Sequence, residues 1–152
     1  MKKSVSILVW AISIFVLLLI IGGIFGYSAY TRSEEYRKKV VESEFKKLIA
    51  LSYAGKFSEV LTREDFLSLL EYTNSEDSSW EEYVDESRQE IEKNFPKYAK
   101  TLDKKDIIVL QVNLDETACY SDNDCYTFHR IVTPLGMSFD VIERDGKYYL
   151  DI

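Results

Sequence analysis

The amino-acid sequence predicts an α+β domain that follows an N-terminal membrane helix. Three observations support this fold class. An uncharged apolar segment of membrane-spanning length lies near the N-terminus, segments with helical periodicity follow it as far as Pro96, and segments that alternate like β-strands fill the remainder. Helices followed by strands are typical of domains in which helices pack on an antiparallel sheet. We therefore expect a transmembrane anchor in residues 1–31 and an α+β domain in residues 32–152.

The segment Val5–Tyr27 has the length and composition of a single membrane span. It contains no charged residue, and about 20 helical residues are enough to cross a hydrocarbon layer of ~30 Å. A helix is expected because the backbone must satisfy its own hydrogen bonds inside a bilayer. A cleaved signal peptide is the alternative, since Lys2 and Lys3 precede the apolar residues. The apolar region of such a peptide is normally ~7–15 residues, and no A-x-A-like site follows, so an uncleaved signal anchor is favoured.

Two glycines in this span are spaced for contact between membrane helices. Gly22 and Gly26 form a small-xxx-small pair, which allows two helices to approach closely. The pair would permit a homo-oligomer, although such spacing is common in membrane helices without any role.

The two cysteines indicate on which side of the membrane the domain lies. Basic residues occur at both ends of the span, so the positive-inside rule gives little information. Cys119 and Cys125 are separated by five residues. Zinc would require four ligands, and a redox pair is more often C-x-x-C. A disulfide that clamps a hairpin is the simplest interpretation, and it requires an oxidising compartment. The N-terminus is then cytoplasmic, and the domain lies outside the cytoplasm.

The charge of the domain excludes one class of partner. Residues 32–152 carry 17 basic and 26 acidic side chains, a net charge of −9. Binding to nucleic acid needs a basic surface along the phosphate backbone. A net negative charge also argues against docking by charge onto an anionic membrane surface. The expected partners are the lipid bilayer around the anchor and other membrane or envelope proteins.

The first helix of the domain is expected at residues 33–55. Ser33 is a suitable N-cap, and acidic residues follow it near the positive end of the helix dipole. Gly55 is a suitable C-terminal stop. No Pro or Gly separates the membrane span from this helix, so the two could form one continuous rod. Its buried face is predicted from helical spacing to consist of Val41, Phe45, Leu48, Ile49 and Ser52.

Two further helices are introduced by capping boxes. Thr62 precedes Asp65 by three residues, and Ser79 precedes Glu82 by the same distance. In this pattern the hydroxyl of the first residue accepts a hydrogen bond from a backbone N–H of the first turn. The second of these helices is expected to end at Phe95-Pro96, because proline interrupts a helix.

The last third of the chain changes to the period of β-strands. Asp145-Gly146 is a strong signal for a two-residue hairpin, and in its register Val141 lies opposite Leu150. The result is an antiparallel meander of four strands. We expect these strands at Ile107–Leu114, Cys125–Thr133, Met137–Arg144 and Lys147–Ile152.

Three features together resemble a known fold family. They are the long first helix ending in Gly55–Val60, the third helix ending at Asn94–Lys97, and the terminal hairpin Val141–Ile152. The pattern is similar to small bacterial domains with the nuclear-transport-factor-2-like, cystatin-like fold. The resemblance implies a curved sheet wrapped round a long helix to form a cone. Many such bacterial proteins carry one N-terminal anchor, and some resemble single-pass scaffold subunits of secretion and conjugation machines. The fold has no shared catalytic motif, so it assigns no functional residue.

Few residues are suited to catalysis or metal binding. His129 is the only histidine and lies on an alternating strand, as an ordinary cross-strand or surface residue would. Asp122-Asn-Asp124 could offer oxygens to calcium, but the further acids and the glycine of an EF-hand loop are missing. Asp140 and Tyr149 could serve as the base and the oxyanion donor of an isomerase-like site. With 11 tyrosines in the chain such a pair arises by chance, so we expect no catalytic site, cofactor or metal.

The aromatic residues of the predicted sheet are better candidates for function. Tyrosine is favoured at protein interfaces, because its ring is apolar and its hydroxyl can remain hydrated. Packing within a small sheet is the simpler explanation for these aromatic residues. We therefore expect a protein-interaction or scaffold domain in a bacterial envelope assembly. Binding of a small apolar ligand in a cone-shaped pocket is the alternative, and an enzyme comes third. The candidate interaction surface is Tyr120, Tyr126, Phe128, Tyr148 and Tyr149.

Overall fold

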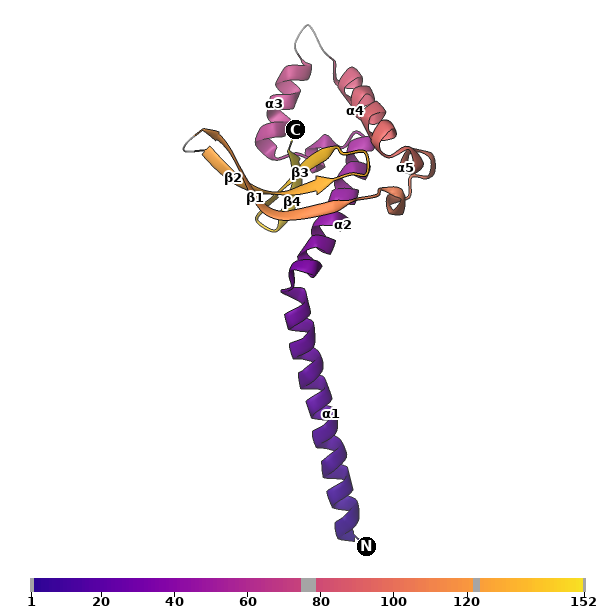
Figure 1. The fold of residues 1–152 in the computed structure, drawn as a ribbon, viewed down its shortest axis with the longest axis vertical. Helices are drawn as coiled ribbons and strands as arrows, with labels where there is room; N and C mark the ends of the chain where they lie inside the picture. The colour runs from indigo at the N-terminus through magenta and orange to yellow at the C-terminus, as the bar shows by residue number, and fades with distance from the viewer. Residues whose placement is uncertain (1, 75–78, 122–123, 152) are drawn as a thin grey trace. The chain divides into compact units, whose positions relative to one another are not determined.

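The computed structural model describes the backbone of residues 2–74, 79–121 and 124–151. It describes the side chains of these residues except 2–14, 120, 121 and 124. The chain divides into two units, Met1–Arg37 and Lys38–Ile152 (Figure 1).

The N-terminal unit is dominated by helix α1, Lys2–Thr31. Ser33 follows it as an N-cap: its hydroxyl donates to the carbonyl of Tyr30 at 2.6 Å and accepts from the N–H of Tyr36 at 3.2 Å. A serine side chain that bonds nearby backbone groups competes with the helical ladder. Helix α2 therefore begins separately at Glu34, and the expectation of one continuous rod is wrong. Among residues with described side chains, only Phe15–Thr31 and Glu34–Tyr53 taken together meet the length and apolarity of a membrane span; no single helix does.

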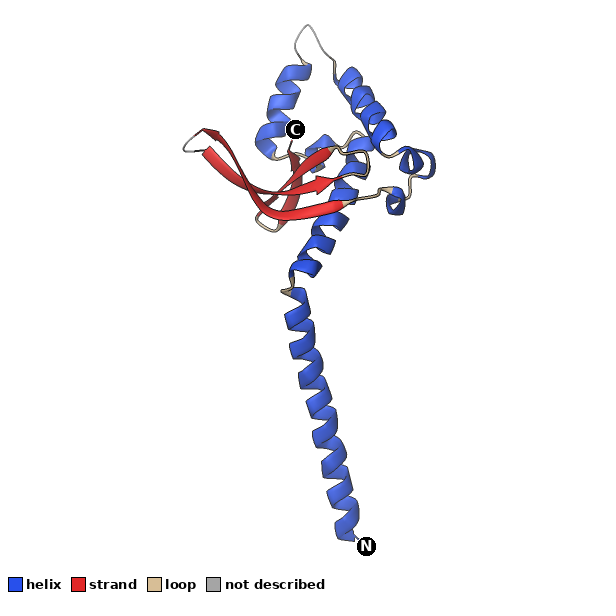
Figure 2. Cartoon of the chain, viewed as in Figure 1, coloured by secondary structure: helices blue, strands red, loops and turns tan. Residues whose placement is uncertain are grey.

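The second unit has an α+β architecture, as predicted, with one four-stranded antiparallel sheet in the order β1-β2-β3-β4. The strands are seen in red in Figure 2. Asp145 and Gly146 both have positive φ, 52° and 72°, as the predicted two-residue hairpin requires. Val141 lies opposite Leu150, which confirms the predicted register. The strands are β1 Gln111–Ser121, β2 Asp124–Val132, β3 Ser138–Arg144 and β4 Lys147–Asp151.

The first strand differs from its predicted position. It begins at Gln111 rather than Ile107 and continues to Ser121. The second half of this strand is polar and shows no alternation, because it belongs to a hairpin that extends away from the core. Its position is set by pairing with β2, in which Cys119 lies opposite Cys125. A bulge interrupts the pairing between Asn113 and Glu116.

The predicted helices begin at their expected N-caps, and the first of them also ends at its predicted glycine. The N–H of Asp65 bonds the Thr62 hydroxyl, and the N–H of Glu82 bonds the Ser79 hydroxyl, both at 3.2 Å. Helix α2 ends in a Schellman motif: Gly55 has φ 75°, and the N–H of Lys56 bonds the carbonyl of Leu51. The helices are α2 Glu34–Tyr53, α3 Arg63–Thr73, α4 Trp80–Asn94 and α5 Pro96–Thr101, with 3-10 turns at Phe57–Glu59 and Lys104–Asp106.

Helix α5 was not predicted. Pro96 predicts the end of a helix, and α4 does end at Asn94. Proline is equally suited to the first position of a helix, where its missing N–H has no partner to lose. Here Pro96 both follows α4 and begins α5.

The core forms where α2 packs on one face of the sheet. The five predicted residues of α2 are all buried. Four of them, Val41, Phe45, Leu48 and Ile49, belong to one buried cluster with residues of all four strands and of α3, α4 and α5. The backbone also closes one sheet edge, since the N–H of Leu150 in β4 donates to the carbonyl of Val60 at 2.9 Å. The inner face of the sheet contributes Val112, Ile131, Val141 and Leu150 to this core.

The cap of α3 gives a first prediction about stability. Thr62 is buried, and its hydroxyl both accepts from the Asp65 N–H and donates to the Asp65 carboxylate at 2.5 Å. We expect Thr62→Ala to lower the free energy of unfolding by about 1–2 kcal/mol, because the cap N–H loses its acceptor. Urea unfolding followed by Trp80 fluorescence, in a Trp10→Phe background that removes the other tryptophan, measures this. Thr62→Ser keeps the hydroxyl and should cost less; an equal cost for both variants would contradict the capping role.

Candidate functional site

The space between α2 and the sheet is filled by side chains. The ring of Phe45 is fully buried, with its centre 5.4 Å from that of Phe139 and 6.3 Å from that of Phe95. Ile49 from α2 and Val141 from β3 are buried beside them. A cone-shaped ligand pocket would have to lie in this space, and packed rings occupy it.

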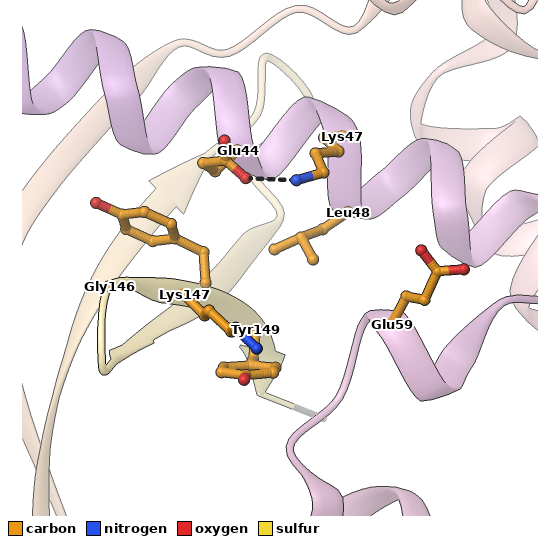
Figure 3. Close-up of a pocket in the computed structure, with 8 residues that line it drawn as sticks. Glu44, Lys47, Leu48, Glu59, Gly146, Lys147 and Tyr149 are labelled. Carbon is orange, nitrogen blue, oxygen red and sulfur yellow. Dashed lines mark hydrogen bonds and ion pairs between the residues drawn. The ribbon is translucent and has the colours of Figure 1, made fainter.

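A groove lies outside this core, between α2 and the hairpin of β3 and β4. Its volume is about 300 Å³. Figure 3 shows Glu44 and Lys47 along one side of the helix, joined by an ion pair of 3.3 Å, and Lys147 and Tyr149 on the strand below. Leu48 also lines the groove but is almost completely buried.

The chemistry of this groove fits a surface contact better than a small apolar ligand. Its exposed lining combines lysine and glutamate side chains with tyrosine rings. Ligand sites are usually lined by apolar side chains with a few polar groups that orient the ligand. Here charged groups of both signs line the opening. Such a groove can receive a polar segment of a partner protein.

His129 lies in the sheet, where its strand position was predicted, but it is buried. Its side chain is only 3% exposed. The Nδ1 atom accepts a hydrogen bond from the N–H of Asp115 at 3.2 Å, and Nε2 lies 3.2 Å from a carboxylate oxygen of Glu143. Both ring nitrogens are therefore engaged. A nucleophile or general base needs a free nitrogen, so this arrangement indicates a structural histidine.

Asp115 explains why this histidine is held so closely. It sits in the bulge of β1 with φ 57°, a conformation that costs energy for a residue with a side chain. Asp is among the residues that tolerate it best. The bulge turns the Asp115 N–H toward His129, and the hydrogen bond fixes both groups.

The candidate catalytic pair Asp140 and Tyr149 lies on the face of the sheet opposite the main core. Asp140 accepts two hydrogen bonds from Arg130, at 2.9 and 3.1 Å. The bond to Asp140 raises the pKa of the Arg130 guanidinium above its ordinary value. Both oxygens of the Asp140 carboxylate are thus engaged by the guanidinium. The arrangement is that of a structural ion pair, which Glu116 extends at 3.1 Å from Arg130.

The five aromatic residues of the candidate interaction surface do not form one surface. Tyr126, Phe128 and Tyr149 share the outer face, because their cross-strand partners alternate in the same register. Phe128 is only 2% exposed and lies beneath Arg130, whose guanidinium carbon is 4.9 Å from the ring centre. Tyr148 lies on the inner face, beside His129. The side chain of Tyr120 falls outside the described residues.

The cysteine pair forms a disulfide, as predicted. Cys119 and Cys125 face each other across β1 and β2, with Cα atoms 4.0 Å apart. Residues 122 and 123 of the candidate calcium loop lie outside the described residues. Where side chains are described, no three His, Cys, Asp or Glu residues gather closely enough to hold a metal ion. Gly22 and Gly26 lie on α1, and a Cβ added at either would meet no atom within 4 Å.

An exposed apolar surface was missed at the sequence level. Ile108 and Leu135 are 58% and 63% exposed, and they line one pocket of about 200 Å³ together with Pro96 and Pro134. Ile108 was assigned to a strand, where one exposed apolar residue is unremarkable. Nothing in the sequence places it beside Leu135, which lies in the turn between β2 and β3. The pair is recognised only when the exposure of each side chain in the folded chain is known.

Comparison with known proteins gives no match for this chain among protein-family models, curated proteins or solved structures.

Proposed function

We propose that this chain is a single-pass membrane protein whose domain, residues 32–152, binds another protein as a scaffold subunit of a bacterial envelope assembly outside the cytoplasm. The filled space between α2 and the sheet carries this proposal. Because the rings of Phe45, Phe95 and Phe139 occupy the place of a ligand pocket, the features left for binding are on the surface. The first alternative, an apolar ligand in the cone, needs the space that these rings fill, and the other, an enzyme, would need a site elsewhere on the domain.

The membrane anchor and the orientation belong to the same proposal. The apolar residues of Val5–Tyr27 fall within one helix of 30 residues. The disulfide supports a domain outside the cytoplasm, because disulfides persist in oxidising compartments. The order of helices and the antiparallel meander support the nuclear-transport-factor-2-like, cystatin-like fold as the family of the domain. Close contact at Gly22 and Gly26 would allow the anchor to form a homo-oligomer.

Photo-crosslinking in intact membranes tests the proposed scaffold role. A photoreactive phenylalanine analogue replaces Tyr148, which lines the groove beside α2 from the inner face of the sheet, or Tyr126 on the outer face. We expect at least one position to give a discrete adduct with another envelope protein. The same analogue at Leu67, an exposed residue of α3, is the matched control. Recovery of only the monomer from both test positions would contradict the scaffold role.

The disulfide gives a prediction about both location and stability. In protein taken from its native membrane, Cys119 and Cys125 should resist alkylation until a reductant is added. Reduction should lower the free energy of unfolding by about 2 kcal/mol, since the bond closes a short loop in the unfolded chain. The double variant Cys119→Ser/Cys125→Ser is the control, because reductant should leave its stability unchanged. Alkylation of both cysteines without reductant would place the domain in a reducing compartment.

A further inference from the structure

Five of the eleven lysines of the domain lie in one short segment. Residues 93–106 contain these five lysines and two acidic residues. The remainder of residues 32–152 contains 12 basic and 24 acidic residues. The net charge of −9 therefore conceals a local surplus of three positive charges. This segment covers the end of α4, the helix α5 and the 3-10 turn Lys104–Asp106.

Hydrogen bonds hold this segment in a fixed shape. The Thr101 hydroxyl donates to one oxygen of Asp106 at 2.6 Å, and Nζ of Lys97 lies 3.0 Å from the other. The Thr101 bond is the main cause of a lowered pKa at Asp106, and Lys97 adds to it. The carboxylate thus ties the 3-10 turn to α5, and the two lie together in Figure 1. Lys100 is exposed near Lys97, since the two are three residues apart on one helix.

The same segment borders the exposed apolar pocket. Lys97 and Asp106 line it, together with the exposed side chains of Ile108 and Leu135. Lys104 and Lys105 are exposed in the adjoining turn, and within the described side chains they have no ion-pair partner. The lysine–apolar face is defined here as Lys97, Lys100, Lys104, Lys105, Ile108 and Leu135.

We propose that the lysine–apolar face docks on the surface of an anionic lipid bilayer. This inference rests on the proposed membrane anchor, which keeps the domain near such a surface. Lysine stems and aliphatic side chains can enter the headgroup region while the ammonium groups remain in contact with lipid phosphates. Each lysine near an anionic surface contributes a favourable electrostatic interaction. The charge and apolarity of this face therefore complement those of the bilayer.

The composition of the face distinguishes lipid from a protein partner. Protein interfaces are enriched in tyrosine, tryptophan, phenylalanine and arginine, and lysine is depleted in them. The lysine–apolar face differs, because its exposed side chains are four lysines and two aliphatic residues, and Phe95, which also lines the pocket, is buried. The aromatic rings nearest in sequence, those of Phe95 and Tyr98, are both buried.

The acidic remainder of the domain does not prevent this docking. At physiological ionic strength, charges are screened over about 8 Å. A domain of this length is roughly 30 Å across. Acidic groups on the far side therefore act only weakly on a bilayer that touches the lysine–apolar face.

Fluorescence of the full chain in vesicles tests the proposal. The variant Leu135→Cys is labelled with an environment-sensitive dye without reductant, so the disulfide is kept, and is reconstituted in vesicles that contain brominated lipids. We expect strong quenching in vesicles with 30% phosphatidylglycerol and little in pure phosphatidylcholine. High salt should reverse the quenching. A label at Leu67→Cys should remain unquenched in both lipids.

A charge variant and a matched control complete the test. Lys100→Gln/Lys104→Gln/Lys105→Gln should weaken docking by about 100-fold. Lys56→Gln/Arg63→Gln/Arg144→Gln removes the same charge from exposed positions elsewhere and should leave the quenching unchanged. Equal quenching in the two lipids, or an equal effect of the two variants, would overturn the proposal. Shielding of the dye in native membranes but not in lipid vesicles would also overturn the proposal, because it would indicate a protein partner. Flotation with the vesicles reports the anchor separately, because an unanchored chain would not float in phosphatidylcholine.

Discussion

Replacing Phe45 by alanine should destabilise the domain more than any other single truncation considered. We expect Phe45→Ala to lower the free energy of unfolding by about 3–5 kcal/mol, through lost apolar burial and the cavity left behind. The side chain is completely buried and its ring contacts those of Phe95 and Phe139, one from the end of α4 and one from β3. A domain of ordinary stability has only about 5–15 kcal/mol in total, so a substantial loss of folded protein is expected.

Urea unfolding of the purified chain in the same Trp10→Phe background, followed by Trp80 fluorescence, measures this effect. Trp80 packs against Phe57 and so reports on the same core. Leu67→Ala removes an apolar side chain that is half exposed on α3, and it should cost less than about 1 kcal/mol. Phe45→Leu, which keeps most of the volume, should lie between the two. If Phe45→Ala were no more costly than Leu67→Ala, the packing between α2 and the sheet would differ from that described.

The helices of the domain could be predicted because local signals agree. Ser33, Thr62 and Ser79 each begin a helix as N-caps, and Gly55 ends one in a left-handed conformation. Such caps act within one turn of chain, so the sequence contains all the information they need. Pro96 shows the limit of this reasoning, since proline serves equally well after one helix and at the start of another.

The bounds of a strand are harder to predict where both of its faces are exposed. The hairpin at Asp145-Gly146 has a specific local signal, and its register followed from it. The polar half of β1 up to Ser121 has no alternation to detect, because neither of its faces covers the main core. Its existence depends on pairing with β2, which is a tertiary interaction. The predicted disulfide at Cys119 and Cys125 marked this hairpin, but not the length of its strands.

The candidate sites depend on contacts between residues that are distant in the sequence. Asp140 is neutralised by Arg130 from the neighbouring strand, and that pairing follows from the register alone. Ile108 and Leu135 meet only because the segment before β1 lies beside the turn after β2. The bulge at Asp115 has no sequence signal of its own, since aspartate with positive φ is uncommon but permitted. Burial of His129 could therefore not be foreseen.

His129→Ala should produce the second large effect, a loss of about 2–4 kcal/mol. The Asp115 N–H would lose its acceptor, and the removed ring would leave a cavity. His129→Asn can place an oxygen near the position of Nδ1, so it should cost less than His129→Leu, which fills more of the space without an acceptor. This order is the reverse of the one that apolarity alone would give.

Hydrogen exchange at the Asp115 amide separates the hydrogen bond from the packing. The amide should exchange faster in His129→Ala and His129→Leu than in the parent chain, and His129→Asn should restore most of its protection. Global unfolding experiments on the same variants give the total cost. If His129→Leu kept both the stability and the amide protection of the parent, the histidine would act by volume alone. The bulge in β1 would then be held by the pairing of the strands rather than by the imidazole.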